Sequence, residues 1–189
     1  MVTGEETAKA ILGVGRIALF DRAGAAGFGK DLKSCARSFW AYAIAAPATL
    51  LLIALGVAHA NPQEPAMMAA ALVIVTIIQA AGFPLLLLPV LRRLGRLERW
   101  AWFVTGYNWF SAAQTIALVT LAGIIGDLPS ASLRGLVVDG SLVYFWVLEA
   151  FLADAVLEIG AWRAIGIVLL DFALGQAAGG LVDWISGLG

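Results

Sequence analysis

Three stretches of this chain, residues 38–60, 66–91 and 100–126, contain no Asp, Glu, Lys or Arg. Each is longer than the roughly 20 apolar residues that a helix needs to cross about 30 Å of hydrocarbon. Two further stretches, 136–157 and 164–184, are mostly apolar but carry acids. Because only helices and closed barrels satisfy their backbone polar groups inside a bilayer, the pattern predicts an all-α polytopic membrane protein, a bundle of five transmembrane helices.

The composition excludes several other classes of protein. The chain is 61% hydrophobic and 13% charged, whereas soluble domains average about 45–50% apolar and about 25% charged residues. A net charge of −1 argues against a nucleic-acid partner, which would require a basic face. The single cysteine, Cys35, excludes an intrachain disulfide and a multi-cysteine metal site. We therefore expect no metal and no cofactor.

The basic residues predict the orientation in the membrane. Of the 12 Lys and Arg residues, only Arg134 falls in a loop on the side opposite the N-terminus. The positive-inside rule then places the N-terminus in the cytoplasm. Five spans place the C-terminus on the other face, the periplasm for a protein of a bacterial inner membrane. Residues 1–20 lack the pattern of a secretory signal peptide.

The segment before the first span, residues 1–36, is expected to be cytoplasmic, and residues 37–187 form the transmembrane domain. Thr3 and Glu6 form a capping box at the start of a first helix, and Asp31 is a suitable N-cap for a helix that runs into the first span. The glycine-rich residues 21–30 are expected to form a loop.

The first helix is predicted to be amphipathic. Glu5, Lys9 and Arg16 share one stripe of a helical wheel, opposite a stripe that includes Ile11 and Val14. Two interpretations stay open. The helix binds anionic headgroups with its basic residues, or it packs as a surface helix on the cytoplasmic end of the bundle.

Glu149 and Asp171 are the residues whose chemistry is most unusual for their position. Each is eleven residues from Gly160, the expected turn between the fourth and fifth spans. At 1.5 Å per residue, both carboxyls lie about 16 Å from that turn, at the same depth. No Lys or Arg lies at that depth to compensate them. The pair is thus a candidate proton or cation site, or each acid is neutral and donates a hydrogen bond to a neighbouring helix.

Other features of the spans favour contacts between helices. Polar side chains of this kind join membrane helices or line a solute pathway, and the candidates are Gln79, Asn108, Ser111 and Gln114. Gly175 and Gly179 form a small-residue surface for close helix packing. Pro84 lies in the second span, where it favours a kink that is either structural or shapes a cavity. Near the last turn, Glu158 is expected to pair with Arg163.

The chain lacks the short motifs of hydrolases and nucleotide-binding enzymes: it has no H-E-x-x-H, G-x-S-x-G or Walker sequence. We therefore expect a non-enzymatic protein.

Its plan of a cytoplasmic N-terminal segment followed by five closely spaced spans resembles the Ypt-interacting (Yip) superfamily. Residues 37–40 (RSFW), followed by Pro47, and residues 107–109 (YNW) look like bacterial members. The Asp-Leu-Tyr-Gly-Pro signature of eukaryotic members is missing, because Asp31-Leu32 is followed by Lys33. The resemblance implies the five-span topology more than an activity, and the missing signature argues against a small-GTPase partnership.

Three functions therefore remain open. The leading hypothesis is a membrane protein that organises, shapes or assists other membrane proteins or lipids. The second is a proton- or cation-coupled transporter of a small solute that uses Glu149 and Asp171. The third is an accessory subunit of a larger membrane complex. The expected partners are the lipid bilayer and another membrane protein or a second copy of the chain.

Overall fold

The computed structural model describes residues 2–59, 65–125 and 128–186. The described chain is helical throughout, which confirms the predicted all-α fold. Five helices are long and apolar enough to cross a membrane, so the chain is an integral membrane protein. The predicted loop residues 60–64 and 126–127 lie outside the described residues. The α-helices are α1 (Gly4–Ala18), α2 (Leu32–Ser38), α3 (Trp40–His59), α4 (Pro65–Leu94), α5 (Trp100–Ile125), α6 (Ala131–Leu157) and α7 (Ala161–Ser186), with short 3₁₀ helices η1 (Arg22–Gly27) and η2 (Leu97–Arg99).

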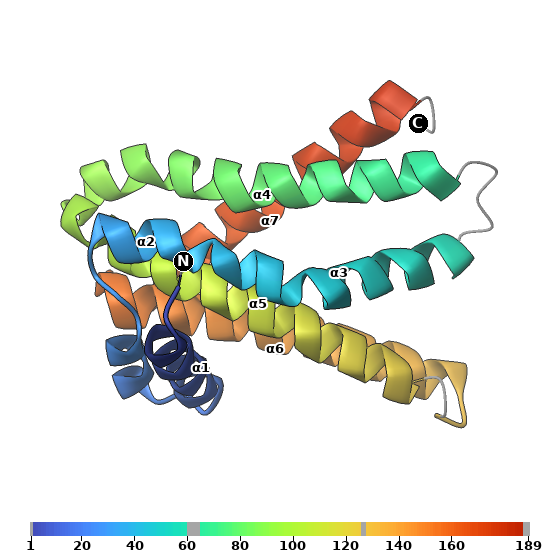
Figure 1. Cartoon of the computed structure of the whole chain (residues 1–189), viewed down its shortest axis with the longest axis horizontal. Helices are drawn as coiled ribbons and strands as arrows, with labels where there is room; N and C mark the ends of the chain where they lie inside the picture. The colour runs from blue at the N-terminus through green and yellow to red at the C-terminus, as the bar shows by residue number, and fades with distance from the viewer. Residues whose placement is uncertain (1, 60–64, 126–127, 187–189) are drawn as a thin grey trace.

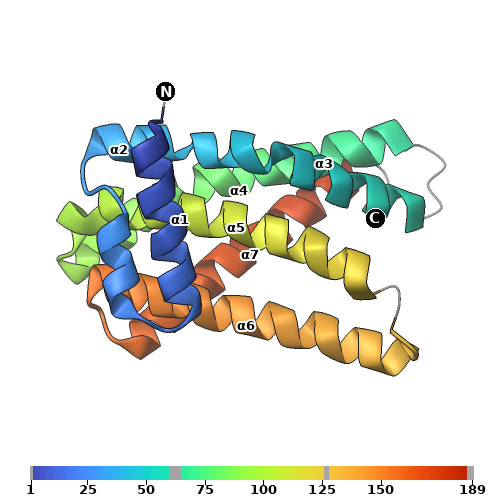
Figure 2. The same cartoon turned by 60° about the horizontal axis from the view of Figure 1, so that its bottom comes forward.

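The five long helices form a ring rather than a row. α3 packs on α5, α5 on α6, α6 on α7, α7 on α4, and α4 returns to α3. The turns from α4 to α5 and from α6 to α7 lie at the same end of the bundle as α1, which we call the α1 end (Figures 1 and 2). Each long helix therefore presents one side to a shared interior.

The fourth span, α6, starts earlier than the hydropathy pattern predicts. Ser130 caps α6 by accepting a hydrogen bond from the Leu133 amide at 3.1 Å. The helix therefore contains Arg134 in its first turn, before the apolar run expected from residue 136. A cap sets the start of a helix, whereas hydropathy reports only its apolar part.

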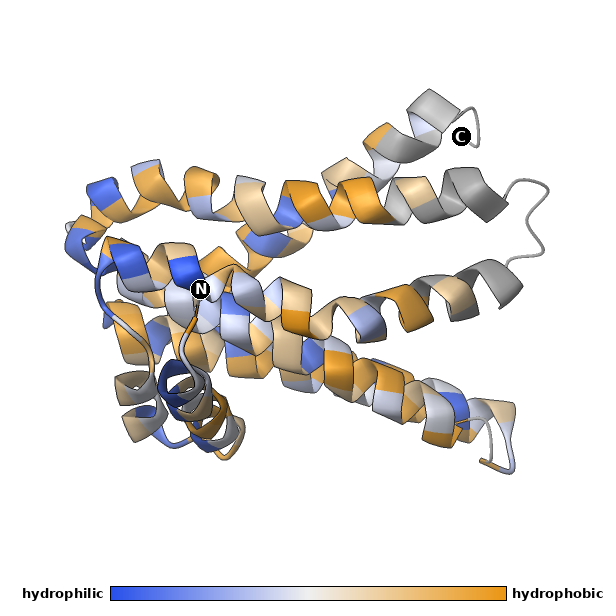
Figure 3. Cartoon of the chain, viewed as in Figure 1, coloured by the Kyte–Doolittle hydropathy of each residue, from blue (hydrophilic) through white to orange (hydrophobic). Residues whose placement is uncertain are grey.

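The tightest packing lies near the α1 end. Most fully buried large side chains belong to the parts of α4, α5, α6 and α7 nearest this end, and they include Phe83, Leu87, Leu91, Phe103, Leu152 and Leu157. Hydrophobic residues cover most of the outer surface of the long helices (Figure 3). In water such a surface would be costly, but lipid chains cover it in a bilayer.

α1 packs across the flank of the bundle, as one of the two interpretations predicted. The packed face only partly overlaps the expected apolar stripe: Ala10, Gly13 and Ile17 are buried and Val14 packs beside them, while Ile11 is 59% exposed. The reason is a close approach of two backbones. A Cβ on Gly13 would lie 2.8 Å from the carbonyl oxygen of Gly24. Residues 22–27, predicted as loop, are the 3₁₀ helix η1 that packs against this glycine face.

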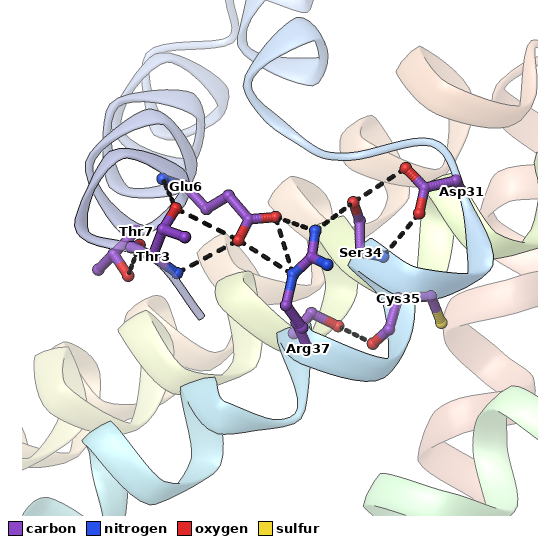
Figure 4. A network of polar contacts seen from close by, with 8 residues as sticks. Thr3, Glu6, Thr7, Asp31, Ser34, Cys35 and Arg37 are labelled. Atoms are coloured by element: carbon purple, nitrogen blue, oxygen red, sulfur yellow. Dashed lines mark hydrogen bonds and ion pairs between the residues drawn. The ribbon is translucent and has the colours of Figure 1, made fainter. Parts of the chain in front are cut away.

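A polar network joins the start of α1 to α2 (Figure 4). The predicted capping box is present, because Thr3 Oγ1 accepts from the Glu6 amide at 3.2 Å and Glu6 accepts from the Thr3 amide at 3.2 Å. The same carboxylate accepts from Nε of Arg37 at 3.0 Å, and that bond holds the pKa of Glu6 below its ordinary value. Asp31 caps α2 as predicted.

The charged residues at the last turn pair differently from the prediction. Glu158 accepts from Arg99 of η2 at 2.8 Å rather than from Arg163, and Asp154 pairs with Arg22 of η1. Glu158 ends α6 in the left-handed conformation, so its carboxylate reaches across to η2. The cluster joins three connections at the α1 end instead of fixing one hairpin.

Candidate functional site

A cavity of about 410 Å³ occupies the interior of the helix ring. All five long helices contribute to its wall. None of the residues that the structure describes as lining it is Lys, Arg or His. Its polar lining residues are Tyr42 of α3; Thr76 and Gln79 of α4; Tyr107, Ser111, Gln114 and Thr115 of α5; Glu149 of α6; and Asp171 and Gln176 of α7.

The cavity lies near the middle of the long helices, between the α1 end and the far end of the bundle. At 1.5 Å per residue, its lining residues on α5, from Tyr107 to Leu118, lie about 10 to 27 Å from the first residue of that helix. Phe83 and Phe103, both fully buried, pack beside Tyr107 with ring centroids 4.7 and 6.1 Å away. These rings and the apolar core beyond them close the floor of the cavity toward the α1 end.

The carboxylate of Asp171 accepts hydrogen bonds at the floor of the cavity. Asp171 is 8% exposed, and the Tyr107 hydroxyl lies 3.0 Å from both of its carboxylate oxygens. A hydroxyl has one hydrogen to donate, so the two oxygens share it. Gln79 of α4 also lies against this carboxylate. Three helices thus meet at Asp171.

Glu149 lines the same cavity but lacks comparable support. It is 6% exposed, and its Oε1 atom has no hydrogen-bond partner among the described residues. A buried polar atom that lacks a partner costs roughly 1–3 kcal/mol, more when it is charged. Native structures satisfy the large majority of such atoms. Glu149 is therefore a buried acid that the described residues satisfy only in part.

The prediction that Glu149 and Asp171 lie at one depth on neighbouring helices agrees with this geometry. Glu149 is about 12 Å from the end of α6, and Asp171 about 15 Å from the start of α7. Both face one cavity. The spacing in the sequence predicts the depth of the two acids. The direction in which their side chains point depends on how α6 and α7 are oriented about their own axes.

Asn108 joins helices through hydrogen bonds, whereas the other predicted polar residues line the cavity. It is fully buried and does not line the cavity. Its Oδ1 accepts from the Tyr42 hydroxyl at 3.2 Å, and its Nδ2 donates to Ser38 Oγ at 2.8 Å. Ser38 in turn donates to the Cys35 carbonyl at 2.7 Å. This chain of bonds joins α5 to α2 and α3 and fixes Tyr42 at the cavity wall.

Gln79, Ser111 and Gln114 line the cavity, as the pathway interpretation requires. The two predicted packing glycines differ from each other. A Cβ on Gly175 would lie 2.9 Å from Nε2 of Gln79, so this glycine permits the approach of α4 to α7. A Cβ on Gly179 would meet no described atom within 4 Å, so the prediction of close packing extends only to Gly175.

Pro84 contributes to the cavity through its missing amide. In a regular helix the amide of residue 84 would donate to the carbonyl of Ala80, but proline has no amide hydrogen. Ala80 lines the cavity. The carbonyl of this cavity-lining residue therefore lacks its usual donor within α4.

Sequence reasoning missed the contributions of Tyr107, Trp146 and Gln176. The polar face of the third span included Tyr107, but its bond to Asp171 depends on the contact between α5 and α7. Trp146 and Phe172 form an edge-to-face ring pair in the cavity wall, with centroids 5.3 Å apart. Both residues are bulky and apolar, like most residues of a membrane span, so the sequence does not indicate that they line a cavity.

The arrangement can hold a positive charge. Two carboxyls, one of them with an orphaned oxygen, lie among hydroxyl, amide and aromatic groups, and the cavity lining contains no basic side chain. In the described residues no group of three or more His, Cys, Asp or Glu side chains could hold a metal ion. The site instead suits a proton, a hydrated monovalent ion or an organic cation.

The chain matches no protein-family model, no curated protein and no solved structure. The resemblance to the Yip superfamily therefore stays a prediction, and so does the role in organising membrane proteins or lipids.

Proposed function

We propose that this protein is a membrane transporter that exchanges protons for a small cationic solute at Glu149 and Asp171. One observation carries the proposal. Glu149 is a buried acid that lines a polar cavity surrounded by all five long helices, and the same cavity contains Asp171. One carboxylate oxygen of Glu149 has no hydrogen-bond partner among the described residues.

The electrostatics support alternation between a proton and a cation. Two ionised carboxylates close together, away from bulk water, repel each other and lose hydration. The pair avoids this cost when it holds a proton or a cation. Since either one relieves the same repulsion, binding of a cation favours release of the proton. That competition is the basic requirement for exchange.

The shape of the cavity supports access from one side at a time. The packed rings of Phe83, Phe103 and Tyr107 close the floor, while the lining residues continue toward the far end of the bundle. A carrier needs a binding site that is closed toward one face of the membrane while it is accessible from the other.

The test uses the full chain in vesicles that are acidic inside and contain a trapped pH-sensitive dye. Sodium, potassium and tetramethylammonium are added outside in separate runs. For the wild type, we expect at least one of them to make the interior more alkaline. Glu149→Gln and Asp171→Asn should each abolish the response, and the double variant should be no worse than either single one, because the two carboxyls act together.

Asp139→Asn is the matched control, because Asp139 is an exposed acid of α6 that does not line the cavity. It should respond like the wild type. Identical traces for the wild type, Glu149→Gln and Asp171→Asn would overturn the proposal.

A further inference from the structure

A second hollow lies against the outer side of the cavity wall. It is an apolar groove of about 570 Å³ between α6 and α7, on the surface of the bundle. Its lining is apolar except at the α1 end, where Arg22 and Asp154 form their ion pair. The aliphatic residues that line the groove but not the cavity include Val143, Val147, Ile165 and Leu169.

The groove and the cavity share part of one wall. Trp146, Val168 and Phe172 line both hollows. The edge-to-face rings of Trp146 and Phe172 form much of this shared wall, and each ring remains 40% or more exposed. The side chains of Trp146 and Phe172, with the buried Val168, therefore form a wall that the acid-lined cavity and the surface groove have in common.

The helices diverge beyond this wall. α6 and α7 pack together from their turn at the α1 end, and α7 then turns away from α6 and crosses toward α4 (Figures 1 and 2). Trp146 and Phe172 each lie about 16 Å from that turn along their own helices. Because both residues lie at one depth, rotation of their side chains would open a passage from the groove to the cavity without movement of either backbone.

We propose that the transported solute is a lipophilic organic cation, and that it reaches Glu149 and Asp171 from the lipid, through the groove and past the Trp146–Phe172 wall. This inference rests on the proposed exchange function and names its substrate class and route. The occupant of the groove is the apolar body of that cation.

Complementarity favours this occupant over an ordinary lipid. Apart from the Arg22–Asp154 ion pair at the α1 end, the groove offers apolar surface. It borders a cavity with two carboxyls and no basic side chain in its described lining. A lipid with a phosphate group would bring negative charge toward those carboxyls. An organic cation presents apolar groups to the groove, a positive charge to the acids and a favourable partner to the faces of the two rings.

The test measures proton release from the full chain in nanodiscs, in weakly buffered solution with a pH indicator and rapid mixing. The two probes are ethidium, an aromatic cation, and tetramethylammonium, which has no large apolar body. We expect ethidium to release protons at a concentration about tenfold lower than tetramethylammonium. Glu149→Gln should release none with either probe.

The route is tested by filling the groove. Val147→Trp adds bulk at a lipid-facing position that lines the groove but not the cavity, and Leu169→Trp does the same from α7. Both should slow proton release by ethidium about tenfold, the effect of roughly 1.4 kcal/mol on a barrier, and leave tetramethylammonium unchanged. Val138→Trp, at an exposed position of α6 outside both hollows, is the matched control and should behave like the wild type.

The outcomes separate the two proposals. If tetramethylammonium releases protons from the wild type but not from Glu149→Gln, while groove filling leaves ethidium unaffected, the route through the lipid is wrong and exchange stands. If Val147→Trp displaces bound lipid from the nanodisc sample without slowing ethidium, the groove is a lipid site only and the inference is overturned. If neither probe distinguishes the wild type from Glu149→Gln, the exchange function fails and this inference fails with it.

Discussion

The two intramembrane acids of this protein differ in what the chain provides for them. Asp171 has the Tyr107 hydroxyl at 3.0 Å from both oxygens, whereas Glu149 has an oxygen without a partner among the described residues. A residue that stabilises the fold normally has its polar atoms satisfied. Hydrogen bonds within the described part of the chain therefore account for the burial of Asp171 better than for that of Glu149.

This difference predicts opposite effects of two conservative substitutions on stability. Glu149→Gln removes the chance of an unpaired buried charge, so we expect the free energy of unfolding to stay the same or rise by about 1 kcal/mol. Tyr107→Phe removes the donor to Asp171 and should lower it by about 1–2 kcal/mol. Thermal unfolding in mild detergent, followed by tryptophan fluorescence, measures both. A loss in Glu149→Gln as large as that in Tyr107→Phe would mean that Glu149 has a structural partner.

At the level of single elements, α1 shows how a helix can have three distinct faces. Ala10, Gly13 and Ile17 pack on the bundle and η1, and Lys9 pairs with Glu5 on an exposed face at 2.7 Å. Ile11 lies exposed on a third side, apart from both. The sequence pattern identified the charged stripe correctly. It placed the packed face too far round the helix, because hydrophobicity does not reveal that glycines permit the closest approach.

The packing role of α1 predicts that two glycines of one helix respond oppositely to alanine. In Gly13→Ala the new Cβ would lie 2.8 Å from the Gly24 carbonyl oxygen, and we expect a loss of about 1–3 kcal/mol. In Gly15→Ala nothing lies within 4 Å, and the better helix propensity should add about 0.5–1 kcal/mol. The measurement is thermal unfolding of both variants, and cleavage of residues 1–30 by a protease reports detachment of α1. Equal effects would contradict the glycine contact.

The contact between α1 and α2 predicts a dependence on pH. The Arg37 guanidinium holds the pKa of Glu6 below its ordinary value of 4.5. The folded-state pKa is thus below the unfolded one, so the contribution to stability is complete above about pH 5 and is lost as the pH falls through the folded-state value. The unfolding temperature of the wild type should drop more between pH 6 and pH 3 than that of Glu6→Gln. A parallel decline in both proteins would show that other groups cause the acid sensitivity.

For the whole molecule, the sequence alone predicted the number of long helices and their approximate bounds. The bilayer imposes that pattern, because each span must be long, apolar and internally hydrogen-bonded. The depth of Glu149 and Asp171 followed from the same geometry. The ring order of the helices, the Tyr107–Asp171 bond and the shared Trp146–Phe172 wall could not be predicted in this way. They depend on the rotation and crossing of each helix, and in lipid these are set by side-chain packing that has no simple periodic signal.

The orientation of the ring in the membrane is the last prediction, and it determines which compartment the cavity faces. Six of the basic residues precede α3, and Arg92, Arg93, Arg96 and Arg99 lie near the turn between α4 and α5, at the same end. The positive-inside rule therefore places the α1 end in the cytoplasm. Since the packed rings of Phe83, Phe103 and Tyr107 close the cavity toward the α1 end, we expect its open side to face the periplasm.

Fusions with two reporters measure this orientation. Alkaline phosphatase fused after Gly189 should be active, because five spans put the C-terminus outside, and the same enzyme fused after Arg96 should be inactive. Green fluorescent protein should give the reverse pattern, which guards against fusions that fail to fold. Fluorescence at Gly189 together with phosphatase activity after Arg96 would mean that the bundle is inserted the other way round. The cavity would then face the cytoplasm, and the proton gradient would drive the solute through the same site from the opposite side.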